Sequence, residues 1–321
     1  MDKNKERRAF DRTYGHRNSW TVIPGEAPDF LCERSGAIVL GVEVTQIWLH
    51  ETDARLANID GYALRLLDGG RILHKDDAAH ILVDKVKILP PGSDMPEAEV
   101  DALIQEHPTP VEKSAALYAA VAHKASKIDA YRSRCPVVDL VVEDASTLFW
   151  FEEFQSLLRP ISGSEFRADL LAAPFREVFL LTHNGEKGAP TCVPLKASLL
   201  MEDLLVLEKL FSAEEEARSI YESPSDANII FSALAQIGHC DLLTCNVDGR
   251  PGLAIGAYTV HWSSTGKVIR DYSNWPASMP TVSRISDITL SAADAALSSA
   301  IAEKRGEFSA SVPIMRRFDD V

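Results

Sequence analysis

Two short segments constrain the fold most: Pro28-Asp29-Phe30 and Gly41-Val42-Glu43-Val44-Thr45 each place a carboxylate on a predicted strand. Between them, the turn signal Arg34-Ser35-Gly36 precedes the apolar run 37–40. We therefore expect the chain to double back as a β-hairpin that carries Asp29 and Glu43 on neighbouring antiparallel strands. Cross-strand neighbours lie about 5 Å apart, so both carboxylates could reach one hard divalent cation.

The composition is typical of a soluble protein with one large core or two modest ones, because 46% of the 321 residues are hydrophobic. No apolar run reaches the roughly 18 residues of a membrane span. The charged N-terminus is not followed by the apolar region of a secretory signal. The five cysteines are scattered without a C-x-x-C pair, which fits a reducing compartment. We expect a cytoplasmic, bacterial-type protein that does not enter the membrane.

The formal net charge of −14 disfavours a protein that grips nucleic acid through its whole surface. Positive charge is nevertheless concentrated in two places, one at the N-terminus and one farther along the chain. These clusters are Lys3, Lys5, Arg7, Arg8, Arg12, His16 and Arg17, and Lys113, His123, Lys124, Lys127, Arg132 and Arg134. They could form a local basic path, or they could be ordinary solvated helix faces.

The first half of the chain predicts a helix, three strands and then an insertion. The helix covers 4–14, the first strand covers Trp20–Ile23, and two further strands flank Gly36. We expect 46–110 to be an insertion. It contains a helix over Asp53–Leu67, a strand near Val83–Leu89, and an acidic, proline-bearing connection with at most one short helix.

A long helix over Val111–Asp129 and a buried strand over Val137–Val142 resume the main fold. A smaller unit is expected to follow a possible linker at Ser223-Pro224-Ser225. Further predicted elements are a helix over Ser146–Leu158, strands over Phe175–Thr182 and Cys192–Leu195, a helix over Ser198–Tyr221, a helix over Asn228–Ile237, a hairpin turn at Asn246–Gly249, strands over Gly256–Trp262 and Lys267–Tyr272, and a helix over Ser291–Glu303.

One lysine stands out on the long predicted helix. Leu117, Val121, Lys124 and Ile128 recur at the spacing of a single helix stripe, so Lys124 lies within an apolar face. A long side chain at the edge of such a face commonly extends its ammonium to water. The alternative is that Lys124 points to the sheet that carries Asp29 and Glu43.

This order of elements, with P-D-F followed by G-V-E-V-T, resembles the PD-(D/E)xK nuclease superfamily over roughly residues 1–145. The resemblance implies an α/β fold with a restriction-endonuclease-like α-β-β-β-α-β core and a mixed sheet. We place this nuclease-like domain at 1–211, with the insertion 46–110 inside it. Residues 212–321 are expected to form a smaller α+β C-terminal domain of unknown role.

The resemblance also implies roles for individual residues. Asp29 and Glu43 match the two metal-binding carboxylates, with the backbone carbonyl of Val44 as a further ligand, and Glu6 matches an additional acidic residue on the first helix. Thr45 occupies the place of the usual catalytic lysine. The hydroxyl of Thr45 cannot supply a positive charge, so a lysine on the following helix, Lys124 or Lys127, would have to replace it.

The implied activity is phosphodiester hydrolysis of nucleic acid, with DNA as the expected substrate, by a Mg²⁺- or Mn²⁺-dependent endonuclease. Hard oxygen ligands suit these ions, which activate water and stabilise charge on the phosphate. By analogy, the role would lie in bacterial defence or DNA processing. Self-association into a homodimer is left open.

Three other interpretations remain. Thr45 makes a catalytically inactive nuclease fold plausible, and such a protein would bind nucleic acid or a partner protein. The C-terminal unit could be a separate ligand sensor. His239, Cys240 and Cys245 could contribute to a zinc site, although their spacing matches no common structural one and no fourth ligand is evident.

Overall fold

The fold is taken from a computed structural model of the chain. The structure describes residues 2–15, 20–68, 74–88, 98–105, 108–145, 149, 158, 161–162, 166–182, 191–212, 233–239, 243–247, 250–263, 266–272, 282–284, 292–304 and 316–317.

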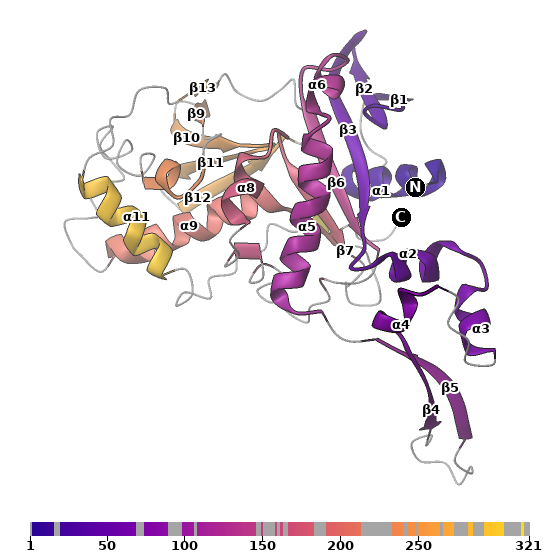
Figure 1. Cartoon of the computed structure of the whole chain (residues 1–321). Helices are drawn as coiled ribbons and strands as arrows, with labels where there is room; N and C mark the ends of the chain where they lie inside the picture. Colours follow the sequence, from indigo (N-terminus) through magenta and orange to yellow (C-terminus); the bar gives the residue numbers. More distant parts are fainter. Residues whose placement is uncertain are drawn as a thin grey trace.

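A seven-stranded mixed sheet forms the centre of the described part of the chain (Figure 1). Strands β1, β2 and β3 are antiparallel neighbours, β3, β6 and β7 run parallel, and β8 and β14 return antiparallel. The α/β class is therefore confirmed. In sheet order the strands are β1 (Thr21–Pro24), β2 (Phe30–Arg34), β3 (Ala37–Ile47), β6 (Val138–Asp144), β7 (Val178–Thr182), β8 (Thr191–Pro194) and β14 (Arg316–Arg317).

The predicted hairpin around Gly36 is confirmed. Ser35 and Gly36 both adopt positive φ angles, 53° and 80°, as a two-residue turn between right-twisted strands requires. The register pairs Phe30 with Val42, so Asp29, one residue before β2, falls opposite Glu43. The turn thus sets which residues of the two strands face each other.

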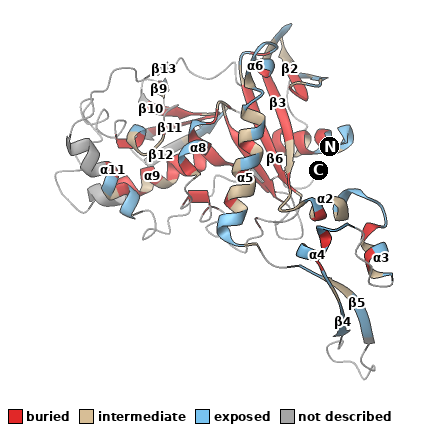
Figure 2. Ribbon diagram, in the orientation of Figure 1, coloured by how far each residue is buried: buried red, intermediate tan, exposed pale blue. Residues whose placement is uncertain are grey.

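Two helices cover opposite faces of the sheet. Helix α1 (Lys3–Tyr14) packs Ala9 and Phe10 with the β3 residues Val42 and Val44 in one apolar cluster. Helix α5 (Pro110–Ala125) packs Leu117 and Val121 with Ile47, Leu140 and Val142 in a second cluster. Figure 2 shows β6 and the central part of β3 buried between these layers.

Helix α5 begins where its sequence predicts and ends earlier. Thr109 and Glu112 form a capping box with Pro110 at the first helical position, which fixes the start. The helix stops at Ala125, and a separate short helix α6 (Ile128–Arg132) follows, so the single helix predicted to Asp129 was wrong over its last turn.

The insertion forms its own small layer. It contains helices α2 (Glu51–Asn58), α3 (Tyr62–Leu67) and α4 (Asp77–His80), and a hairpin of β4 (Leu82–Ile88) and β5 (Ala98–Ile104). The expected single helix over 53–67 is interrupted before Gly61, which has a φ of 69°. The proline-bearing connection ends in strand β5 rather than in a helix. The hairpin projects from the body of the protein (Figure 1).

Residues beyond β6 extend the main core. Strands β7 and β8 agree with prediction, as does helix α9 (Leu195–Ser212) over the described part of its predicted range, while 213–221 lie outside the described residues. Leu200 and Leu204 of α9 share an apolar cluster with Leu253 and Val260 of the second sheet. The other elements are α8 (Arg167–Ala172), β9 (Leu243–Val247), β10 (Arg250–Ile255), β11 (Tyr258–Ser263), β12 (Gly266–Asp271), β13 (Val282–Arg284) and α11 (Ala292–Lys304).

The predicted C-terminal hairpin and final helix are confirmed by β9 pairing with β10 and by α11. Three further predictions fall on residues that the structure does not describe. They are most of the helix predicted over 146–158, the linker near 224 and the turn residues 248–249. The apolar core continues across position 211, and the domain boundary placed there stays a prediction.

A buried hydrogen bond from Tyr14, at the end of α1, to Asp139 ties this helix to the centre of the sheet, beside the ion pair of Asp139 with Arg176. Asp139 of β6 accepts from the Tyr14 hydroxyl at 2.8 Å and from Arg176 Nε at 2.8 Å. Nearby, burial raises the pKa of Glu177 to about 8, while the backbone amides of Val178 and Lys196 donate to its carboxylate. Each of these buried polar groups is hydrogen-bonded, as burial of a polar group requires.

Gly41 of β3 has no room for a side chain, because Pro28 and Cys135 pack directly against it. A Cβ at this position would lie 2.7 Å from Pro28 Cγ and would also collide with Cys135 Sγ. Gly41→Ala should lower the free energy of unfolding by about 1–3 kcal/mol, measured by urea denaturation. In the Gly41→Ala/Cys135→Ala double variant the loss should be smaller than the sum of the two single losses. Strict additivity would contradict the proposed collision.

Candidate active site

Asp29 is held at the start of β2 by the neighbouring strand. Its Oδ2 accepts a hydrogen bond of 2.9 Å from the Val44 amide, and only 7% of the residue is exposed. Its other oxygen, Oδ1, lies 3.4 Å from Lys3 Nζ. One carboxylate oxygen is therefore committed to the hairpin, and the other faces a cation.

Glu43, at the middle of β3, is more deeply buried. Its Oε1 lies 2.5 Å from Lys124 Nζ, which makes Lys124 the lysine that reaches this site. The second oxygen, Oε2, is buried without a hydrogen-bond partner among the described residues. Burial raises the pKa of Glu43 above its usual range, the Lys124 ammonium opposes this rise, and the negative charge of Asp29 adds to it.

The Tyr131 hydroxyl of α6 lies close to Glu43. It too is buried without a hydrogen bond of good geometry, although its proximity lowers the pKa of Glu43. Burial and the charge of Glu43 in turn raise the pKa of Tyr131 well above its usual value. Tyr131 therefore stays protonated and presents a hydroxyl to the site.

Glu6 and Lys3, both on the first turns of α1, complete the acidic end. Lys3 Nζ lies 3.0 Å from Glu6 Oε2, and this interaction is the largest cause of the raised pKa of Lys3. Glu6 is buried, with 6% of the residue exposed. Through Lys3, Glu6 joins the same cluster as Asp29, the place where the resemblance puts an additional acidic residue.

The remaining predicted site residues are placed less favourably. Thr45 is half-buried two positions beyond Glu43, on the same side of β3 by strand alternation. Lys127 is exposed and lies at the start of α6. The structure thus brings Lys124 to the acidic pair and leaves Lys127 at the surface.

Lys3 and Tyr131 were missed as site residues by the sequence reasoning. A lysine three residues before Glu6 is the only local signal for the first, and it is common on exposed helices. Tyr131 follows the break after α5, which the helical pattern did not predict. A third contact that was missed joins Gln46 Nε2 to Glu143 Oε2 at 2.8 Å, and Arg12 of α1 lies 3.7 Å from the same carboxylate.

The oxygen atoms of the site are of the kind that a hard cation binds, but their carboxylates contact lysine ammonium groups. Asp29 and Glu43 supply carboxylate oxygens, and Glu43 Oε2 has no hydrogen bond to lose. Within the described ranges, however, no group of three acidic, histidine or cysteine side chains has the arrangement needed to hold a metal ion. The carboxylates instead contact the ammonium groups of Lys3 and Lys124.

The zinc interpretation finds no support in the residues that can be placed. His239 Nε2 lies 2.6 Å from Asp203 Oδ2 in a buried network with Arg167, and Cys245 is buried in a separate apolar cluster. Cys240 lies outside the described residues. None of the cysteines that the structure describes, which are Cys32, Cys135, Cys192 and Cys245, forms a disulfide.

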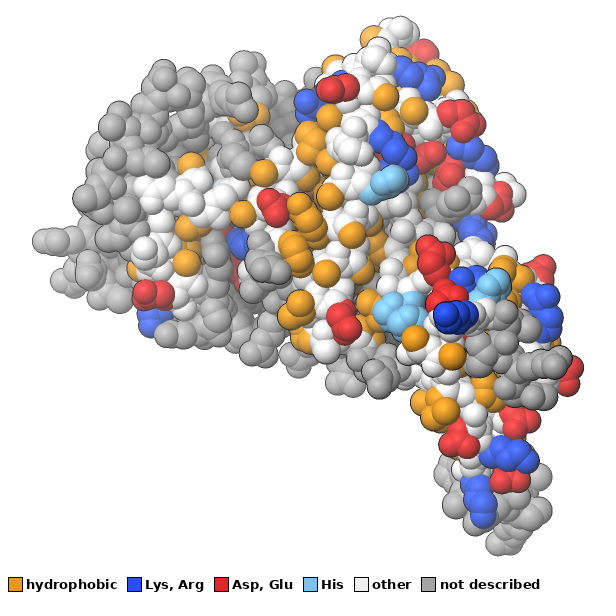
Figure 3. All heavy atoms as spheres, viewed as in Figure 1, with side chains coloured by type: hydrophobic (Ala, Val, Ile, Leu, Met, Phe, Trp, Pro, Cys, Tyr) orange, Lys and Arg blue, Asp and Glu red, His pale blue; other side chains and the backbone are white. Residues whose placement is uncertain are grey.

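The two basic clusters are partly neutralised by neighbouring acids. Arg7 pairs with Asp11 at 3.0 Å and Arg12 contacts Glu143, while His16 and Arg17 lie outside the described residues. Figure 3 shows hydrophobic side chains along α5 and charges of both signs beside them, rather than one continuous basic surface.

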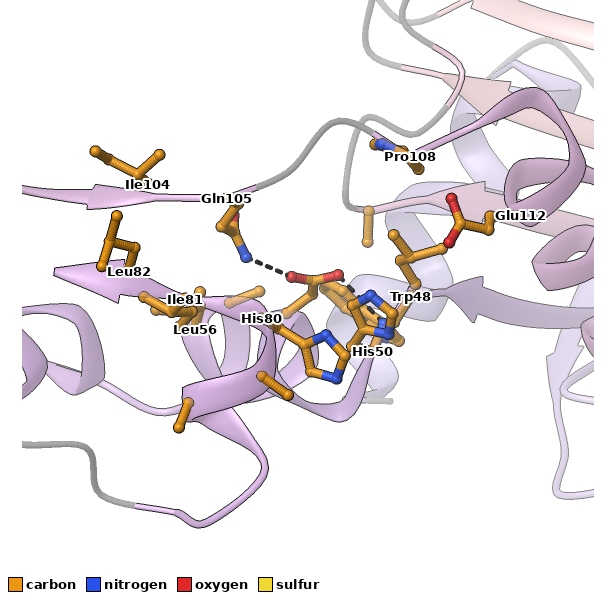
Figure 4. Close-up of a pocket in the computed structure, with 16 residues that line it drawn as sticks. Trp48, His50, Leu56, His80, Ile81, Leu82, Ile104, Gln105, Pro108 and Glu112 are labelled. Atoms are coloured by element: carbon orange, nitrogen blue, oxygen red, sulfur yellow. Dashed lines mark hydrogen bonds between the residues drawn. The ribbon is translucent and has the colours of Figure 1, made fainter.

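A separate cavity of about 670 Å³ lies at the seam between the insertion and the main sheet. The Gln105 amide donates a hydrogen bond of 2.7 Å to the Asp53 carboxylate, and Figure 4 shows Gln105 and the stacked rings of His50 and His80 lining this cavity. Glu112 on its wall precedes Lys124 by twelve residues of α5, a rise of about 18 Å. The cavity is therefore distinct from the acidic pair.

Comparison of the chain with protein-family models, curated proteins and solved structures found no significant match. Among the described residues, no helix combines the length and the apolar character needed to cross a bilayer. The functional interpretation therefore rests on the geometry of the site.

The raised pKa of Glu43 predicts a pH-dependent stability difference. Because the fold favours protonated Glu43, its contribution is fully present below the unfolded-state pKa and is lost as the pH rises through the folded-state pKa. Glu43→Gln removes this titration, so its unfolding free energy relative to the unsubstituted protein should increase from pH 4 to pH 8. Urea denaturation at several pH values measures this difference. The exposed Glu51→Gln variant is the control, and a pH-independent difference for Glu43→Gln would contradict the prediction.

Proposed function

We propose that the chain is a metal-dependent nuclease with a restriction-endonuclease-like core. The observation that carries the proposal is that Asp29, just before β2, Glu43 of β3 and Lys124 of α5 gather at one buried place on the sheet. The element order agrees with this proposal, because α1, β1, β2, β3, α5 and β6 follow each other as helix, three strands, helix and strand around the insertion. The parallel pairing of β3 with β6 further supports it.

In this proposal Asp29 and Glu43 hold Mg²⁺ or Mn²⁺, with the Val44 carbonyl as a further oxygen. When bound, the ion supplies a nucleophilic water and charge stabilisation at the phosphate. Lys124 contributes a fixed positive charge beside Glu43 in a partly dry site, where charge interactions are stronger than in water. Lys124 would thus supply the positive charge that is missing at the motif position occupied by Thr45.

The second candidate is an inactive nuclease fold that binds nucleic acid or a partner protein. The observation that favours it is that lysine ammonium groups already neutralise both carboxylates, since Lys3 contacts Asp29 and Lys124 contacts Glu43. A protein of this kind would bind its partner without needing Mg²⁺. Catalysis and metal dependence therefore separate the two candidates.

The first test is cleavage of a panel of single- and double-stranded DNA and RNA with Mg²⁺ or Mn²⁺. Asp29→Asn and Glu43→Gln should each lower the cleavage rate by at least about 100-fold, the usual cost of losing one essential electrostatic contact. Glu51→Gln, which changes an exposed carboxylate on α2, should retain the full rate. Metal-dependent cleavage that persists in purified Glu43→Gln would reject the proposed site.

The second test asks which lysine acts. Lys124→Met removes the ammonium beside Glu43 and should slow cleavage by a similar factor, whereas Lys127→Met should leave the rate within about twofold, because Lys127 is exposed. Single-turnover rates at saturating metal measure both effects. Equal losses in the two variants would argue against a specific role for Lys124.

A further inference from the structure

The ammonium of Lys3 lies among oxygen atoms at the acidic end of the site. Lys3 Nζ is 3.0 Å from Glu6 Oε2, 3.1 Å from the Gly25 carbonyl, 3.4 Å from Asp29 Oδ1 and 3.8 Å from Glu26 Oε1. Three carboxylates and a carbonyl thus converge on one positive charge. These are the oxygen types that a hard divalent cation also takes as ligands.

The position of Lys3 at the first residue of α1 is not explained by helix formation. A cation in the first turn opposes the helix dipole, whereas Glu6 in the same turn is favourable. The contacts with Glu6 and Asp29 offset this cost. The lysine is therefore held at the site by the acidic groups it neutralises.

The Lys3 ammonium and a divalent ion at the same Asp29 carboxylate would repel each other. Oδ2 of Asp29 already accepts the Val44 amide at 2.9 Å, and Oδ1, the oxygen more open to a cation, is the one that Lys3 contacts. Mg²⁺ holds oxygen ligands at about 2.0–2.1 Å, closer than the ammonium does. An ion bound at Oδ1 would need Lys3 to move away.

We propose that Lys3 is a tethered competitor of the divalent cation at Asp29. The proposal rests on the proposed function, because it concerns the metal of that same site. The side chain of Lys3 is 51% exposed, so its ammonium can return to water without unfolding α1.

The expected effect follows from the fraction of molecules in which Asp29 Oδ1 is free. An apparent dissociation constant equals the intrinsic one divided by the competent fraction, so a competitor present in 80–90% of molecules weakens binding about five- to tenfold. Replacing Lys3 by an uncharged side chain of similar length removes the competitor and should recover this factor.

The experiment measures Mn²⁺ binding by the electron paramagnetic resonance signal of free Mn²⁺, with no substrate present. Lys3→Met should bind Mn²⁺ about five- to tenfold more tightly than the unsubstituted protein. Lys5→Met is the matched control, because Lys5 lies on the same helix and contacts Asn58 Oδ1 at 2.7 Å, away from the carboxylates. Its Mn²⁺ affinity should not change. Lys3→Arg keeps a cation and should stay close to the unsubstituted affinity.

Several outcomes would overturn the inference. Unchanged or weaker Mn²⁺ binding by Lys3→Met, in a protein that still cleaves nucleic acid, would reject competition and leave the proposed nuclease function standing. Absence of Mn²⁺ binding in both proteins, together with absence of cleavage, would reject both proposals. A circular dichroism melt confirms that each variant is folded before its affinity is compared.

Discussion

The need to pair two buried carboxylates, Asp29 and Glu43, with positive charges constrains where the helices pack on the sheet. Asp29 is held by the Val44 amide and Lys3, and Glu43 is held by Lys124. A buried charge without such partners would cost several kcal/mol. The helices α1 and α5, which cover opposite faces of the sheet, each bring the lysine that one of these carboxylates needs. Apolar packing and charge compensation therefore place the same two helices.

The sequence predicted the parts of the fold that local chemistry determines. The Ser35-Gly36 turn fixed the hairpin, and the alternation of β3 placed Glu43 and Thr45 on one side. The helical stripe correctly placed Lys124 among apolar neighbours but left open whether its ammonium turns to water or to the sheet, and the structure shows it at Glu43. These signals lie within a single turn, strand or helix, where few alternative structures compete.

The sequence prediction failed where a helix ends without a strong stop signal, or where contacts between residues far apart in the chain determine the structure. The interruption before Gly61 and the end of α5 at Ala125 divide stretches that share one helical pattern. Strand β5 alternates Ala98, Val100, Ala102 and Ile104, but the surrounding acids and prolines concealed it. Asp139, Tyr14 and Arg176 meet only in the folded chain, because 125 positions separate the first two. The role of Lys3 required the same three-dimensional information.

The pair between Lys124 and Glu43 joins residues 81 positions apart, with the whole insertion between them. During synthesis, β3 leaves the ribosome well before α5, so the Lys124 ammonium is not yet available to pair with Glu43 when β3 emerges. Contacts of such long range form slowly, because closing a long loop costs conformational entropy before the contact can stabilise the chain. The Asp29 end of the site, from Lys3 to Val44, is by contrast formed by residues closer together in the chain. The two halves of the site therefore belong to different stages of folding, and the hairpin can be in place before the lysine that completes it arrives.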